Sequence, residues 1–274
     1  MGILERRSGS GLIDEGALRD VLTPRSIRIA TTVVVALVVW QLASTFAFEP
    51  NVLPSPLAVA RRVPEIIEAG DARSRSALFH LRVTLVRVAI VTAVSMTAAV
   101  AFGLLMSAYE AVEDMFTLLL PFWMTFPTVV VVLVTMVMFE FSEFSVVSAA
   151  IVITTPYAAV SIWEGTQNLD RDLVEMGEAF GASTYAMYRH VHLPNVFPAV
   201  FSSFRYLFSM VWKIVVIAEV FGIQNGMGAQ FRFWFGESSM VTLLAYAALF
   251  LVVMFAFEYG VIYPVERYVF RWRA

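Results

Sequence analysis

The stretch VTLVRVAIVTAVSMTAAVAFGLLMSA, residues 83–108, decides the fold class. It carries a single charge, at Arg87. A helix needs about 20 mostly apolar residues to cross a bilayer, so this stretch predicts a transmembrane helix. The composition agrees: 59% of the chain is hydrophobic and 15% charged, against about 45–50% and about 25% in soluble domains.

Five further stretches have the same character, at residues 29–47, 115–139, 146–163, 197–221 and 240–262. The chain is therefore predicted to be an all-α polytopic membrane protein with six transmembrane helices. Prolines inside a span are tolerated when neighbouring groups satisfy the freed carbonyls. Pro121 and Pro127 predict kinks in the third span, and Pro156 predicts one in the fourth. The first stretch is too long for a signal peptide, whose apolar region has about 7–15 residues.

Six spans place both termini on one side of the membrane. With the termini in the cytoplasm, eleven arginines lie inside and six outside, which the positive-inside rule favours. We expect a cytoplasmic segment over 1–28 and one transmembrane domain over 29–274. That domain would carry an external segment at 49–80 and a cytoplasmic loop at 169–194. In the external segment, Ser55-Pro56 predicts the start of a short helix over 56–69.

Several function classes are excluded by what the sequence lacks. Without cysteine there is no disulfide or thiolate chemistry. A net charge of −3 gives no footprint for nucleic acid. No phosphate-binding loop of the form G-x-x-x-x-G-K-[ST] occurs, so the chain cannot hydrolyse ATP itself. The three histidines, His80, His190 and His192, show no metal-binding spacing.

The cytoplasmic loop at 169–194 is too polar to span the membrane, and it contains residues that typically start and end a short helix. Asp172 is placed to cap a helix over 173–180, with Glu175 in the first turns, where the helix dipole favours acids. Gly181 follows, at the position where a helix end prefers a left-handed residue.

A second short helix is predicted directly afterwards. Ser183 is placed to cap a helix over 184–190, and Leu193-Pro194 would stop it. The loop is therefore expected to be a rigid bent element on the cytoplasmic face. These local signals fit a docking element and an ordinary interfacial loop equally well.

The same loop resembles the "EAA" loop of ABC importer permeases. That pattern is Glu-Ala-Ala, three residues, Gly, nine residues, Ile, one residue and Leu-Pro, and the spacing agrees throughout. Glu175, Gly181, Leu193 and Pro194 match in identity and Val191 matches in kind. Met176 and Gly177 replace the two alanines, and of these Gly177 keeps the small size.

The resemblance implies that the loop forms coupling helices that insert into a cleft of a separate ATPase subunit. The residues it assigns to this contact are Glu175, Gly177, Ala179, Gly181, Ala182, Ser183, Leu193 and Pro194.

Other motifs resemble the nitrate/sulfonate/taurine/bicarbonate permease group. They are Leu53-Pro54-Ser55-Pro56, Gly181-Ala182-Ser183, and Trp212 followed by Ala218-Glu219, Gly222, Gly226 and Gly228. One position departs from that group. Its third span usually ends in Trp-Phe-Gly, whereas this chain has Met138-Phe139-Glu140, with Glu143 three residues later.

The resemblance also implies an architecture and partners. The fold would be an extra N-terminal helix plus the five-helix core of a type I ABC permease, in the inner membrane of a prokaryote. A second permease copy, identical or related, two ATPase subunits that bind ATP–Mg, and an extracytoplasmic solute-binding protein would complete the complex. This chain would hold no cofactor or metal. It would move a small anionic or organic solute by alternating access.

Ionisable residues inside spans are costly and usually face the bundle interior or a water-filled path. Candidates for lining a translocation path are Lys213, Glu219, Trp212, Phe126 and Glu140. A lone cation at Lys213, the only lysine, would suit an anionic cargo. The alternative is an internal ion pair of Lys213 with Glu258 or Glu140. For Arg87 the simplest expectation is a side chain that extends to the membrane interface.

Two other functions remain open at this stage. An ion-coupled secondary transporter could use Glu140, Glu219 and Glu258 as proton carriers, but it leaves the loop at 169–194 unexplained. A membrane anchor without transport would not need charges inside its spans.

Overall fold

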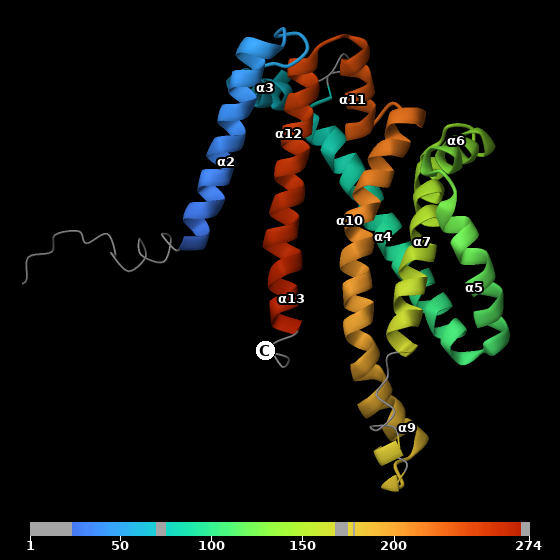
Figure 1. Cartoon of the computed structure of the whole chain (residues 1–274). Helices are drawn as coiled ribbons and strands as arrows, with labels where there is room; N and C mark the ends of the chain where they lie inside the picture. Colours follow the sequence, from blue (N-terminus) through green and yellow to red (C-terminus); the bar gives the residue numbers. More distant parts are fainter. Residues whose placement is uncertain (1–23, 70–74, 168–174, 178, 270–274) are drawn as a thin grey trace, which may run out of the picture.

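The computed structural model describes residues 24–69, 75–167, 175–177 and 179–269, and within them all regular secondary structure is helical (Figure 1). The predicted all-α class is therefore confirmed. Three long helices form the centre: α4 (Ala77–Ala108), α7 (Glu143–Gln167) and α10 (Leu193–Gly222). Small residues let α4 and α7 approach closely, since a side chain in place of Gly103 would collide with Ile162.

Hydroxyl groups join the three central helices inside the bundle. Ser95 Oγ on α4 lies 2.9 Å from Thr154 Oγ1 on α7. Ser203 Oγ on α10 donates to Ser161 Oγ on α7 at 2.8 Å. Such interhelical hydrogen bonds hold helices together where the surrounding lipid gives no hydrophobic driving force. The centre is thus a fixed frame for the polar groups at its two ends.

Five helices are long and apolar enough to cross a membrane, and a bent pair makes a possible sixth. Besides the three central helices, they include the first and the last helix of the chain. The first is α2 (Pro24–Leu42), which continues into the π-helix η1 (Ala43–Ala47). The last is α12 (Met240–Phe257), which continues through η3 (Glu258–Ile262) and α13 (Tyr263–Val269).

The first two predicted spans end where the sequence predicted, at Ala47 and Ala108. The second begins earlier than predicted: α4 starts at Ala77, six residues before residue 83, and Ser76 caps it.

The predicted third span is wrong as a single kinked helix. It consists of α5 (Glu110–Thr125) and α6 (Thr128–Met138), which meet at 93°. Pro127 explains the break, because proline forces the preceding residue out of the helical region and Phe126 is extended, with ψ of 132°. Pro121 and Pro156 lie inside α5 and α7 without ending either helix.

Two short helices lie at the end of the bundle away from α9 (Thr184–Met187) (Figure 1). The first, α3 (Pro56–Ala69), begins as predicted, with Ser55 Oγ accepting from the Ala58 N–H at 3.2 Å. Its last residue, Ala69, agrees with the predicted range 56–69. The second, α11 (Met227–Gly236), was not predicted.

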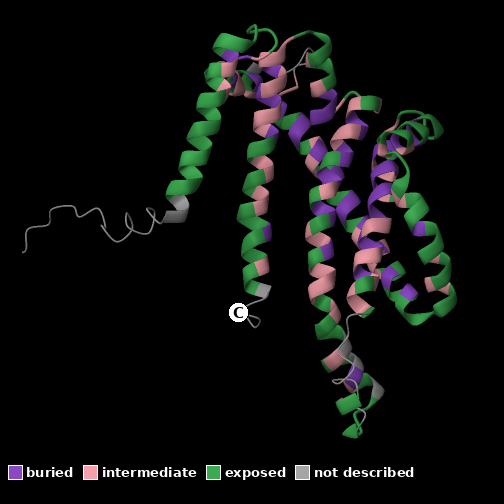
Figure 2. Ribbon diagram, viewed as in Figure 1, coloured by how far each residue is buried: buried purple, intermediate pink, exposed green. Residues whose placement is uncertain are grey.

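α2 stands apart from the bundle, and most of its described side chains are exposed (Figure 2). The indole N–H of Trp40 anchors its upper end by donating to the Pro54 carbonyl at 3.0 Å. A helix that is apolar on every face is stable only in lipid or against another protein. The predicted membrane environment is therefore the one in which this arrangement makes physical sense.

Candidate functional site

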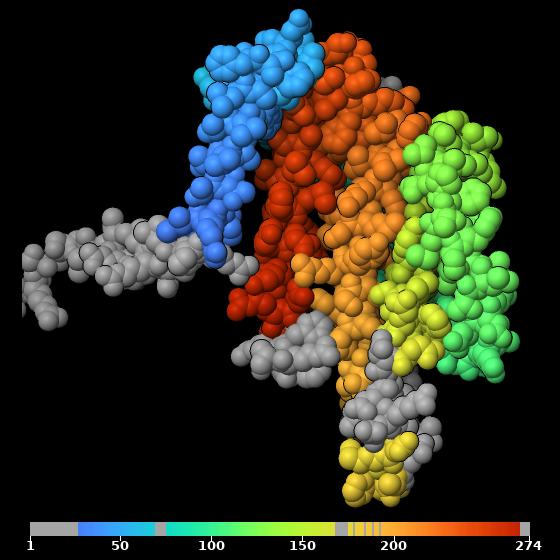
Figure 3. All heavy atoms as spheres, viewed as in Figure 1, coloured from blue at the N-terminus to red at the C-terminus, as the bar shows by residue number. Residues whose placement is uncertain are grey.

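The described part of the loop between α7 and α10, drawn in yellow, projects beyond the other described helices (Figure 3). Its described part comprises residues 175–177 and 179–183, the short helix α9 (Thr184–Met187) and the π-helix η2 (Tyr188–His192). Asp172, the predicted cap, and the first residues of the helix predicted over 173–180 lie outside the described residues.

The corner of the loop has the geometry that the sequence predicted. Gly181 adopts a left-handed conformation with φ of 68°. The Ala182 N–H donates to the Gly177 carbonyl at 3.0 Å, which is the hydrogen bond that closes a helix around a left-handed glycine. Ser183 Oγ then accepts from the Ala186 N–H at 3.3 Å, so the predicted cap of the second helix is confirmed.

Gly177 has a packing role within this corner. A side chain at this position would displace the flexible end of the Met187 side chain, which is buried. The small residue retained there lets the two halves of the loop pack against each other. Gly177 stands where the EAA pattern has its second alanine, and the Met187 side chain fills the space that the missing methyl group leaves.

One part of the predicted loop is wrong. Leu193-Pro194 does not end a helix, because α10 begins at Leu193 directly after η2. Proline is tolerated in the first turn of a helix, and the wider π turn of Tyr188–His192 accommodates the ring. The loop is therefore joined without interruption to a central helix of the bundle.

The tip of the loop exposes large apolar side chains. The exposed fractions of Phe180 and Tyr185 are 85% and 72%, and Met176 is also exposed. Exposed apolar groups gathered on a projecting element mark interaction surfaces. Of the eight residues assigned to ATPase contact, Gly177 is half-buried and the other seven are exposed: Glu175, Ala179, Gly181, Ala182, Ser183, Leu193 and Pro194.

α10 carries a polar stripe on one exposed side. Ser202, Tyr206, Ser209 and Lys213 are all exposed and recur at intervals of four, three and four residues, so they share one face of the helix. Neighbouring Trp212 lies on another face and is buried. A polar face on a helix of membrane-spanning length has to be covered by protein or water rather than by lipid.

Lys213 is not part of either predicted internal pair. It has no ion pair with any residue that the structure describes, and Glu140 is exposed at the end of α6. Glu258 instead binds Arg205, whose guanidinium lies 3.0 Å from Glu258 and 2.6 Å from Glu266. Arg205 thereby joins α10 to the last helix.

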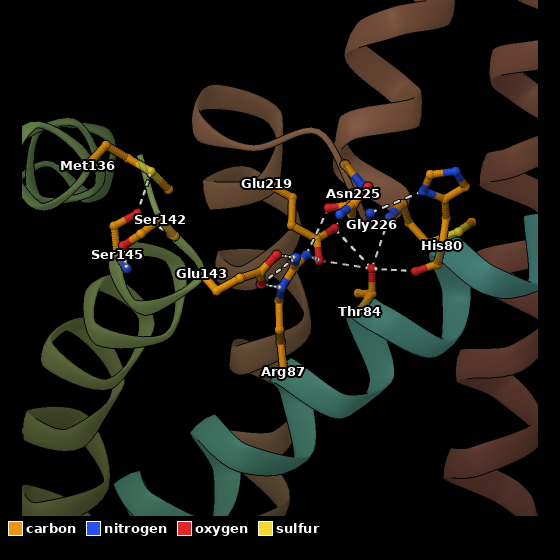
Figure 4. Close-up of polar contacts among 12 residues, drawn as sticks. His80, Thr84, Arg87, Met136, Ser142, Glu143, Ser145, Glu219, Asn225 and Gly226 are labelled. Carbon is orange, nitrogen blue, oxygen red and sulfur yellow. Dashed lines mark hydrogen bonds and ion pairs between the residues drawn. The ribbon is translucent and has the colours of Figure 1, made fainter. Parts of the chain in front are cut away.

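A second polar cluster, which we call the outer network, lies at the opposite end of α10 from the loop (Figure 4). Its centre is Arg87 on α4, whose side chain is only 4% exposed. Arg87 Nη1 donates to Glu219 at 2.6 Å and to the Asn225 carbonyl at 2.9 Å. The expectation that Arg87 extends to the interface is wrong, because two carboxylates and a carbonyl satisfy it inside the protein.

Glu219 is held from several sides. It has no exposed surface, and its carboxylate accepts from Thr84 Oγ1 at 2.9 Å and from the Gly228 N–H at 2.9 Å. The backbone comes close because residues 226 and 228 are glycines, and a side chain at either would collide with Glu219. Glu219 is therefore enclosed by its own chain in this structure, and its place on a translocation path stays a prediction.

His80 completes the network beside the turn that leads into α11. The Gly226 N–H donates to His80 Nδ1 at 3.2 Å, and Gln230 Nε2 lies 3.1 Å from His80 Nε2. Because Nδ1 accepts, the neutral ring carries its proton on Nε2, and the Gln230 amide is satisfied when its oxygen faces that proton. These contacts fix the turn between α10 and α11.

The second carboxylate on Arg87 comes from Glu143, the first residue of α7. Arg87 Nε donates to it at 2.8 Å and Nη2 at 2.6 Å, so the contact is bidentate. Sequence analysis noted Glu143 and Arg87 separately but could not join them, because 56 residues separate them. The available signal was that each is a charge inside or beside an apolar span.

Comparison with known families adds the class of protein. Residues 95–263 match the family model described as "Binding-protein-dependent transport system inner membrane component". This match covers more than half of the chain. The chain belongs to that family. It is thus an inner-membrane permease component of an ABC transporter, a family that works generally with ATPase subunits and binding proteins.

Individual relatives are distant. The permease is 22% identical to the nitrate import permease protein NrtB of Synechocystis sp., over 86% of each chain. It is 24% identical to the formylaminopyrimidine transport permease protein ThiX of Halalkalibacterium halodurans, over 70% of this chain and 74% of that one. With the taurine transport system permease protein TauC of Escherichia coli it shares 20% identity, over 86% of each chain.

A solved structure shows the same fold. The crystal structure of an amino acid ABC transporter with histidines superposes with a TM-score of 0.60. At 17% identity, the match covers 77% of this permease and 97% of that chain. The helical architecture predicted from resemblance to ABC permeases is thereby confirmed.

Proposed function

We propose that this permease belongs to an ATP-driven importer and moves a small anionic or organic solute across the inner membrane by alternating access. The observation that carries the proposal is the loop at 175–194. It projects from the bundle, exposes Phe180 and Tyr185 and continues directly into α10. An ion-coupled secondary transporter would have no use for such an element.

Partner ATPase subunits would bind ATP–Mg, while this chain holds neither. ATP binding would draw the loops of two permease copies together, and α10 would carry that movement towards the outer network. The continuous 30-residue helix spans about 45 Å at 1.5 Å per residue. Either a homodimer or a pair with a related permease would serve this mechanism.

The polar stripe on α10 is the proposed wall of the path. A second permease copy would face Ser202, Tyr206, Ser209 and Lys213 across a water-filled space, which removes the cost of polar groups in lipid. Lys213 would attract an anionic cargo. Of the other path candidates, Phe126 and Glu140 are exposed, whereas Trp212 and Glu219 would act from behind the wall.

Recovery of an ATPase with the purified permease tests this proposal. The double substitution Glu175→Arg and Gly181→Trp changes the charge and the shape of the loop corner, and we expect it to abolish co-purification. The matched control is Glu140→Arg with Gly236→Trp, the same changes at exposed positions at the other end of the molecule. Retained ATPase binding by the loop variant would refute the docking role.

Transport measured with Lys213→Met tests the path separately. We expect a slower uptake of an anionic solute with ATPase binding unchanged. An unchanged uptake rate would remove Lys213 from the path and leave the docking proposal standing.

A further inference from the structure

The two carboxylates bound to Arg87 differ in their surroundings. Glu219 is completely buried and has three kinds of partner: Arg87, Thr84 and the backbone at Gly228. The side chain of Glu143 is 63% exposed, and the side-chain partner it has among the described residues is Arg87. Glu219 is thus fixed, whereas Glu143 reaches the guanidinium from the solvent side.

Departure of Glu143 leaves no uncompensated buried charge. Arg87 and Glu219 neutralise each other, and an isolated buried ion is the costly case. The Glu143 carboxylate can turn away from Arg87, since the rest of the chain leaves more than half of its side chain uncovered. By contrast, loss of Glu219 would strip Arg87 of its buried counter-charge.

Glu143 can leave by rotation of its own side chain, without movement of a helix. Ser145 and Val146, two and three residues after Glu143, have no exposed surface, and the Ser145 hydroxyl donates to Met136 Sδ at 3.0 Å. The first turn of α7 is therefore anchored. The guanidinium edge formed by Nε and Nη2 would remain in place and face outward.

We infer that this outward edge of Arg87 is a binding site for an oxyanion group, which Glu143 occupies as an internal substitute. Two parallel N–H donors on a planar guanidinium match two oxygens on one carbon, sulfur or nitrogen atom. Carboxylate, sulfonate and nitrate all present that pair. An uncharged or cationic solute offers no such group and would leave Glu143 in place.

The inference deepens the proposed function, on which it rests, because it gives an anionic cargo a contact at the outer end of the permease. A tethered carboxylate competes at a high effective concentration, on the order of millimolar or above. A dilute anion would therefore not displace Glu143, but one released locally at the outer mouth would. Competition with Glu143 thus sets the anion concentration that is needed to occupy the site on Arg87.

The test is anion binding by the purified permease without ATPase, followed by the shift in thermal unfolding with methanesulfonate. Chloride at equal ionic strength gives the baseline. We expect Glu143→Ala to show a saturable rise in Tm, with an apparent Kd at least about tenfold lower than that of the wild-type chain. Glu140→Ala is the matched control, because it removes the same charge three residues away without touching Arg87.

A second variant identifies the donor. Arg87→Lys in the Glu143→Ala background keeps the charge that neutralises Glu219 but removes the planar pair of donors, and we expect the saturable response to disappear. The inference fails if Glu143→Ala shows no saturable response, if Glu140→Ala responds equally, or if Arg87→Lys leaves the response intact. Failure of ATPase co-purification would overturn the proposed function and not this site, since binding is measured on the permease alone.

Discussion

At the scale of single residues, burial separates the charges that have ion-pair partners within this permease from those that have none among the described residues. Arg87 and Glu219 are buried together and hydrogen-bonded on all sides, whereas Lys213 is exposed and unpaired among the described residues. Sequence analysis could place all three in apolar spans but not tell them apart. The distinction depends on contacts across 132 residues of sequence, such as Arg87 with Glu219, which no local pattern encodes.

Glu219→Gln is expected to destabilise the permease by about 3 kcal/mol, because Arg87 loses its buried counter-charge and keeps only the largely exposed Glu143. The glutamine oxygen can still accept from Thr84 and the Gly228 N–H, but the NH2 group then faces Arg87, so the change removes both the charge and the hydrogen bond to Arg87. Thermal or denaturant unfolding in detergent measures the loss. The control Glu65→Gln removes an exposed pair with Arg62 and should cost less than about 1 kcal/mol. Equal losses in the two variants would contradict the structural role of Glu219.

At the scale of elements, sequence signals worked where a local cause decides the outcome. The caps at Ser55 and Ser183 and the left-handed Gly181 were predicted, because each depends on residues within one turn. Pro127 was predicted to kink a single third span, whereas the structure shows two helices that meet at 93°. How far a proline bends a helix depends on packing of the following segment, here of α6 against α7 and α10.

The ends of two helices use the same motif with different residues. Gly181 closes the helix before the loop corner with φ of 68°, and Glu140 closes α6 with φ of 55°. In both, an N–H one residue later bonds back across the last turn, from Ala182 to Gly177 and from Phe141 to Met136. Glu140 stands where the nitrate/sulfonate/taurine/bicarbonate permease group has glycine, so the structure explains why glycine suits that position.

Glu140→Gly is accordingly expected to stabilise the permease. A left-handed conformation costs a residue with a side chain about 1–2 kcal/mol, and the extra freedom of glycine in the unfolded chain returns about 0.5–1 kcal/mol of that. The net gain in the free energy of unfolding is therefore about 0–1.5 kcal/mol. Glu140→Ala removes the charge but keeps the side-chain carbon, so it should give no comparable gain. A gain in both variants would assign the effect to charge and not to backbone strain.

At the scale of the whole molecule, the direction of successive helices shows which connections lie at the same end of the bundle (Figure 1). α5 is shorter than a typical span, but it runs beside α7 from the loop side to the opposite side (Figure 1). α5 and α7 therefore form a pair of crossings joined by α6. Six crossings return the C-terminal helix to the side of the projecting loop, which is the side predicted to be cytoplasmic.

The absence of cysteine makes this topology directly testable. Val52, in the turn between η1 and α3, and Tyr109, between α4 and α5, are both exposed and lie at opposite ends of the bundle. In intact cells, a membrane-impermeant maleimide should label a Val52→Cys variant but not a Tyr109→Cys variant. Permeabilisation should then expose the Tyr109→Cys variant to the reagent.

Phe180→Cys, at the tip of the loop, should behave like Tyr109→Cys, because both positions belong to the proposed ATPase side. An added ATPase subunit should protect Phe180→Cys while leaving Tyr109→Cys reactive after permeabilisation. Labelling of Phe180→Cys from outside intact cells would reverse the orientation. It would then remove the loop from the reach of any cytoplasmic motor, whatever its resemblance to a coupling element.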